Sequence, residues 1–209
     1  MPWKWEPNTG RYRNDAGQFM SSERVLEFVN ESIDASEGVV DQYATMVSNG
    51  TVSPSGWKTL MRQEIKEEYI RQYLLGIGGR PQMSPSDWGS LGGMLKEQYT
   101  RLNGFADDIT DGKLSEAQIR QRSQMYINSA REGFERASQK TALETGNDEV
   151  RWVVDQLVEN CEDCLDFSDK GWQKIEDDPY GGAFPGSGDT VCLTNCACHL
   201  EYRGSDGES

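Results

Sequence analysis

Four helix-start signals divide the first two thirds of the chain and limit its fold more than any other feature. Serine is a favoured N-cap, and proline is favoured in the first helical turn because its missing N–H has no partner there. We therefore expect four long helices between residues 21 and 145, joined by short loops. The starts are Ser21 or Ser22, Ser53-Pro54, Ser84-Pro85 and Leu114-Ser115.

Apolar side chains follow each start at steps of three and four residues, which is the spacing of one helix face. The fourth stripe continues without interruption to Ala137, so one helix is expected there, ending at Thr145-Gly146. We expect these stripes to form the core of a bundle. The main expected core residues are Val29, Ile33, Val40, Trp57, Met61, Ile65, Tyr69, Tyr73, Trp88, Leu91, Leu102, Phe105, Ile119, Tyr126, Ala130, Phe134 and Ala137.

Residues 1–20 form a polar arm with scattered aromatic side chains. The stretch Arg11–Phe19 contains Asp-Ala-Gly, which is typical of a turn, and predicts a strand, a turn and a second strand. Trp3 and Trp5 are costly to leave in water. They either fold back on the chain's own helices or dock into a neighbouring subunit.

All five cysteines lie between residues 161 and 198. A C-x-x-C pair presents two sulfurs from one turn, and a second group some tens of residues later completes a tetrahedron for Zn²⁺. We expect four of the five cysteines to bind a structural zinc ion that stabilises a tail with few apolar residues. His199 is an outside candidate. The candidate ligands are Cys161, Cys164, Cys192, Cys196 and Cys198.

Three other uses of the cysteines stay open. A disulfide pair is disfavoured in a reducing compartment, which the apolar-poor N-terminus indicates, unless the protein ends in an extracellular particle. A redox C-x-x-C needs flanks that lower a thiol pKa, whereas Glu162 and Asp163 raise it. A catalytic zinc would belong to a deaminase or peptidase motif, and the chain contains neither H-x-E with P-C-x-x-C nor H-E-x-x-H.

Charge and composition exclude several classes of protein. The net charge is −14, which argues against a protein that mainly grips nucleic acid. The acidic excess is concentrated in residues 147–209, which hold 15 acidic and 4 basic side chains. A single histidine leaves little room for a Ser-His-Asp or Cys-His enzyme, and no apolar run reaches the ~20 residues of a membrane span.

In the stretches Arg11–Phe19, Gly104–Tyr126 and Trp152–Leu200, the chain resembles the minor head proteins of tailed bacteriophages, the Mu F-like or head-morphogenesis family. Many members close with His-Pro-x-Cys-Arg-Cys, where this chain has Cys192 in place of His-Pro and Ala197 in place of arginine. The last sixty residues match best. They share the C-x-x-C pair Cys161 and Cys164, the Pro185-Gly186 pair before the second cysteine group, and the closing Cys-x-Cys of Cys196 and Cys198.

The resemblance implies a non-enzymatic structural protein of the virion head, made in the host cytoplasm. It implies a role in head assembly at or near the portal and in DNA packaging or ejection. The implied partners are the portal protein or the major capsid protein, with at most weak, local contact with packaged DNA and none with a membrane. The alternatives are a capsid cement or head-tail connector protein, and a cytosolic zinc-module adaptor or zinc enzyme.

The expected fold is mainly α, an elongated helical bundle with a small cysteine-stapled, irregular or β module at the C-terminus. The expected divisions are an N-terminal arm (1–20), a helical domain (21–146) and an acidic Cys-rich module (147–209).

Overall fold

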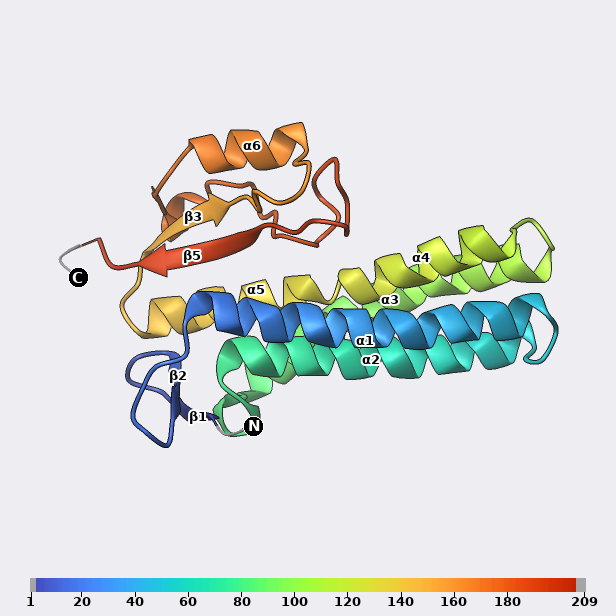
Figure 1. The fold of residues 1–209 in the computed structure, drawn as a ribbon, viewed down its shortest axis with the longest axis horizontal. Coiled ribbons are helices and arrows are strands. Elements are labelled where there is room, and N and C mark those ends of the chain that lie inside the picture. Colours follow the sequence, from blue (N-terminus) through green and yellow to red (C-terminus); the bar gives the residue numbers. More distant parts are fainter. Residues whose placement is uncertain (1–2, 206–209) are drawn as a thin grey trace.

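The computed structural model describes residues 3–205, and the side chain of Trp3 lies outside this description. The expected fold class is confirmed: the chain is mainly helical, with a small module of strands and a cysteine cluster near its C-terminal end (Figure 1). The bundle helices are α1 (Ser22–Ser48), α2 (Pro54–Ile77), α3 (Pro85–Thr110), α4 (Glu116–Asn128) and α5 (Arg131–Glu144).

The predicted helix starts are confirmed by their caps. Each of the four serine side chains accepts a hydrogen bond from a backbone N–H in the first turn of the helix that follows. Two of the starts are capping boxes, in which the third helical residue bonds back to the cap. The capping serines are Ser21, Ser53, Ser84 and Ser115, of which the last two form the boxes.

The single fourth helix expected from the Ser115 start to Thr145-Gly146 is wrong, because the structure divides it into α4 and α5 at Ser129 and Ala130. The backbone there tightens to a 3₁₀-type step, with the Ala130 N–H donating to the carbonyl of Ile127 at 3.0 Å. The buried hydroxyl of Tyr69 lies 2.9 Å from the Ser129 hydroxyl, and that hydroxyl donates to the Tyr126 carbonyl. A contact from α2 therefore fixes the break.

The core of the bundle is built from the expected stripes, with one error. Trp57, Ile65 and Phe105 are fully buried, and the rings of Trp57 and Phe105 meet edge to face at 5.0 Å. Trp88 was expected in the core, but 38% of it is exposed. In that turn the buried position belongs to Asp87, which accepts hydrogen bonds from Tyr73 and Lys140 and so rotates the tryptophan toward the surface.

A buried carboxylate also joins α1 to α2. Glu68 is fully buried and accepts hydrogen bonds from Ser32 at 2.8 Å, Ser36 at 3.0 Å and Gln72 at 2.7 Å. Arg71, one turn away on the same helix, pairs with it. Because all these donors converge on one residue, they favour a single register between the two helices.

The N-terminal arm forms a hairpin of β1 (Trp3–Glu6) and β2 (Arg11–Asn14). The expected strand pairing within Arg11–Phe19 is reduced to one bridge, between Arg13 and Phe19. Trp5 packs against the bundle core and its ring fills the space beside Gly78, the left-handed residue that ends α2. The interpretation that the arm folds back on the chain's own helices is therefore right for Trp5.

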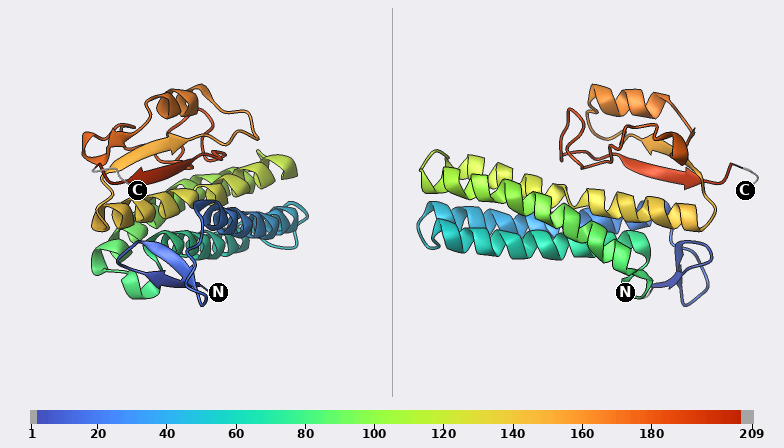
Figure 2. Two further views of the ribbon diagram at one scale, coloured as in Figure 1. Left: turned by 60° about the vertical axis from the view of Figure 1, so that its left-hand side comes forward. Right: turned by 180° about the vertical axis from the view of Figure 1, so that it is seen from behind.

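The C-terminal module has a hydrophobic cluster of its own, around Val150, Trp152 and Tyr180. Its sheet has the order β4-β3-β5, with both neighbours antiparallel to β3. The short helix α6 packs against β3, while β5 faces α5 (Figure 2). The module's elements are β3 (Glu149–Val153), α6 (Glu162–Asp169), β4 (Gln173–Lys174), a 3₁₀ turn at Ile175–Asp177 and β5 (His199–Arg203). A further 3₁₀ turn, at Arg80–Gln82, lies between α2 and α3 of the bundle.

The molecule is elongated along the bundle axis (Figure 1). The hairpin and the module lie toward one end. The loops 49–53 and 111–115 lie together at the other end, where Thr45 donates a 2.8 Å hydrogen bond to Glu116.

Candidate metal centre

Two segments of the module bring the cysteines together. Cys161 is the N-cap residue of α6 and Cys164 lies in its first turn, so the C-x-x-C pair turns both thiols the same way. The second segment is tied to α6 by the Val191 N–H, which donates to Asp163 at 2.8 Å. The chain then turns through Leu193, a non-glycine residue with φ of 54°, and reaches Cys196 and Cys198 just before β5.

Two of the sulfur–sulfur distances have the size found in a tetrahedral metal–thiolate site. Cys164 Sγ lies 3.8 Å from Cys192 Sγ and 3.6 Å from Cys196 Sγ. Four sulfurs about 2.3 Å from one zinc ion lie about 3.8 Å from one another, by the geometry of a tetrahedron. All five cysteines are free thiols in the structure. The arrangement could hold a metal ion.

Five sulfurs form two overlapping groups rather than one. Cys161, Cys164 and Cys192 lie within 4.8 Å of one another, and so do Cys164, Cys196 and Cys198. Cys164 belongs to both groups and is almost fully buried. Cys164 is therefore the sulfur common to both groups, and a single ion with four ligands would draw sulfurs from both.

Hydrogen bonds between the thiols give the cysteines different pKa values. The hydrogen bond with Cys196 lowers the pKa of Cys198 to about 6, and the same contact together with burial raises the pKa of Cys196. Burial raises the pKa of Cys164 as well. Sulfurs this close cannot all carry a negative charge without a cation between them, which is the role a metal ion fills.

Polar groups from outside the cluster surround the sulfurs. The Thr190 hydroxyl lies 3.2 Å from Cys192 Sγ, and Asn160 Oδ1 lies 3.7 Å from Cys198 Sγ. Arg131, on α5, is buried and donates a hydrogen bond to Asn30, and its charge is attracted by those of Glu135, Cys196 and Cys198. A guanidinium beside a cluster of thiolates offsets part of their negative charge.

Sequence reasoning missed Arg131 and Glu135, which lie one helical turn apart on α5 and look like ordinary surface charges. Glu135 is fully buried beneath β5, and burial raises its pKa to about 8 despite the nearby Arg131. Its Oε2 accepts a 3.4 Å hydrogen bond from the Leu200 N–H. The two side chains mark where the module rests on the bundle.

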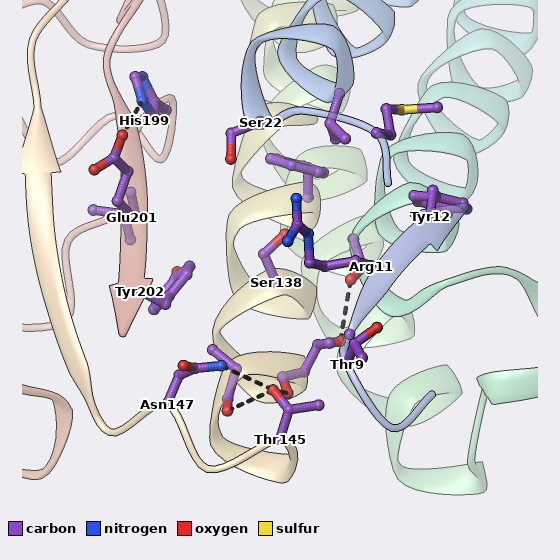
Figure 3. A pocket seen from close by; sticks show the side chains of 18 of the residues that line it. Thr9, Arg11, Tyr12, Ser22, Ser138, Thr145, Asn147, His199, Glu201 and Tyr202 are labelled. Carbon is purple, nitrogen blue, oxygen red and sulfur yellow. Dashed lines mark hydrogen bonds and ion pairs between the residues drawn. The ribbon is translucent and has the colours of Figure 1, made fainter. Parts of the chain in front are cut away.

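His199 does not join either group of sulfurs. It lies on β5, where Nε2 is 3.7 Å from Glu201 Oε1, and burial lowers the pKa of its imidazole (Figure 3). The two residues line a cavity of about 670 Å³ between β5, α5 and the N-terminal hairpin. Arg11 and Ser138 reach the same cavity from the hairpin and from α5.

None of the helices in residues 3–205 is both long and apolar enough to cross a membrane. A comparison of the chain with protein-family models finds no match, and comparisons with curated proteins and with solved structures find none either.

Proposed function

We propose that the cysteine cluster holds one structural zinc ion and that the chain is a non-enzymatic protein of a tailed-phage virion. The observation that carries the metal assignment is the spacing of 3.6 and 3.8 Å from Cys164 Sγ to two other sulfurs, which matches two edges of a tetrahedron of thiolates. Zinc fits because an all-thiolate site suits a soft, redox-inactive ion. The ligands are Cys164 and three of Cys161, Cys192, Cys196 and Cys198.

The proposed role of the ion is structural rather than catalytic. The module's own apolar cluster is small, and three of its members are Cys164, Cys196 and Cys198. A site closed by four thiolates leaves no position for a substrate or a reactive water. The ion would therefore hold the module in shape and do no chemistry.

Elemental analysis of protein purified under reducing conditions tests the metal. We expect about one zinc per chain, lost when Cys164→Ser removes the sulfur common to both groups. Leu165→Ser is the matched control, because this neighbouring side chain is 47% exposed and offers no metal ligand. Iron in place of zinc, or thiols that resist alkylation until they are reduced, would refute the zinc assignment.

The virion role is supported by an elongated helical body carrying a rigid acidic module. We propose that the helices pack on the portal protein or the inner capsid wall, and that the module is a docking element. Quantitative mass spectrometry of purified particles tests this role. A copy number like that of the portal supports a minor head protein, one like that of the major capsid protein supports a cement protein, and absence from the particle refutes both.

A further inference from the structure

The module carries most of the exposed apolar side chains of the chain. Of the seven large hydrophobic residues exposed in the described residues, five lie between positions 157 and 193. Four of them are on the two loops that meet at the cysteine cluster, where the sulfurs of Cys161 and Cys192 are within 4.8 Å. We call these four the module patch: Leu157, Val158, Val191 and Leu193, with exposed fractions of 94, 47, 61 and 46%.

The module patch has an acidic rim. Glu159 and Glu162 are exposed in and beside the first loop, and Asp189 is exposed next to the second. Figure 1 shows both loops at one end of the module, beside the start of α6. An apolar patch with a charged border is typical of a protein-binding surface, because leaving it in water is unfavourable.

A surface of opposite character lies between α2 and α3. Arg62 and Lys66, one turn apart on α2, face Lys96 on α3 across a groove floored by Leu95 and Tyr99. The Arg62 guanidinium stacks on the Tyr99 ring at 4.3 Å. We call this surface the basic groove.

The basic groove stands out because most other cations of the chain are neutralised. Among the described residues, thirteen lysines and arginines form ion pairs with carboxylates, and none of the three groove cations does. Within residues 3–205, no acidic side chain lines the basic groove. In a protein of net charge −14, such a site selects an acidic partner.

We propose that the module patch of one chain docks into the basic groove of a second copy, so that the chains associate head to tail. Leu157 and Val191 would meet Leu95 and Tyr99, while Glu159 and Glu162 would face the groove cations. The two surfaces do not meet within one chain, because the module rests on α5 while α2 and α3 lie side by side on the other side of the bundle (Figure 2).

Two different surfaces of the same chain make the contact heterologous, which generates rings or open arrays rather than closed pairs. Nucleic acid is the less favoured occupant, because it would use the three cations and leave the module patch exposed. The acidic rim of the module patch and the chain's net charge would also repel the phosphates of a nucleic acid. This inference does not depend on the virion role.

Sedimentation velocity of the metal-loaded chain of residues 1–209 over a concentration series tests the proposal. We expect self-association at 0.15 M salt that weakens as salt rises. The groove variant Lys66→Glu/Lys96→Glu and the patch variant Leu157→Asp/Val191→Asp should each weaken it at least about tenfold. All four positions are exposed, and unchanged zinc content and circular dichroism show that the variants fold.

The decisive sample is a 1:1 mixture of the two variants. Each retains one intact surface, so the mixture should form a dimer that grows no further. Lys4→Glu/Lys113→Glu makes the same change in net charge outside the groove and should associate like the unmodified chain.

A monomeric unmodified chain, or a mixture that stays monomeric, would overturn the proposal. So would binding of a short DNA duplex that the groove variant abolishes in a chain that does not self-associate, since this result assigns the groove to nucleic acid.

Discussion

Replacing Trp57 and Trp88 with alanine separates a core tryptophan from a surface one. Trp57 is fully buried, whereas 38% of Trp88 is exposed beside the Arg80 guanidinium. Burying about 250 Å² of tryptophan stabilises by at most about 6 kcal/mol. The Trp57 N–H has no hydrogen-bond partner among the described residues, so its loss removes packing alone.

We therefore expect Trp57→Ala to lower the free energy of unfolding by about 3–5 kcal/mol, the usual cost of emptying a large core site. Trp88→Ala should lower it by about 1 kcal/mol or less. Trp57→Phe, which keeps a ring against Phe105, should recover most of the loss.

Urea unfolding followed by far-ultraviolet circular dichroism measures these differences from the shift in midpoint at constant slope. Equal losses for the two alanine variants would refute the reasoning, because they would mean that Trp88 is buried in solution against a partner or that Trp57 is not in the core.

Three further perturbations test the fold and the module. Burial disfavours the ionised form of Glu135, so Glu135→Gln should gain stability over the unmodified chain as pH rises from 4.5 through about 8. The gain in free energy of unfolding should be small at pH 5 and reach up to about 5 kcal/mol at pH 9. A pH-independent difference in urea midpoint would contradict this. Gly78→Ala should lower the free energy of unfolding, followed by heating, by more than about 1 kcal/mol, since φ of Gly78 is +88° and a Cβ there would lie 2.0 Å from Trp5. The control Gly89→Ala meets nothing within 4 Å and should stabilise its helix. Chelation of the metal should abolish the near-ultraviolet signal of Trp152 and preserve most of the helical signal, because that ring belongs to the module's cluster and not to the bundle core; loss of both signals together would show that the two clusters unfold as one.

Local chemistry explains which parts of the fold could be predicted from the sequence. A serine before an apolar stripe satisfies backbone donors within one turn, so the four helix starts needed no knowledge of distant contacts. The break at Ser129 depends on the Tyr69 hydroxyl, sixty residues earlier in the chain, and the stripe on either side continues unchanged. Trp88 was misplaced because Asp87, a polar residue, takes the buried position through Lys140.

The candidate site was predictable in kind but not in detail. The C-x-x-C spacing of Cys161 and Cys164 presents two sulfurs from one turn, so the cluster could be expected from the sequence. The choice of ligands depends on how the second segment folds back, which no spacing fixes. Arg131 and Glu135 have the spacing of an exposed helical pair, yet both are buried, and Glu135 accepts a hydrogen bond from Leu200 of the module.

The shared position of loops 49–53 and 111–115 has a practical consequence for engineering. Both connect helices at the end of the bundle opposite the hairpin and the module, and both lie in turns at the surface. Exposed turns tolerate inserted sequence better than packed elements. A fluorescent protein or an affinity peptide placed in either loop would stand far from the cysteine cluster, so the chain can be labelled in a living cell while both of its ends stay unmodified.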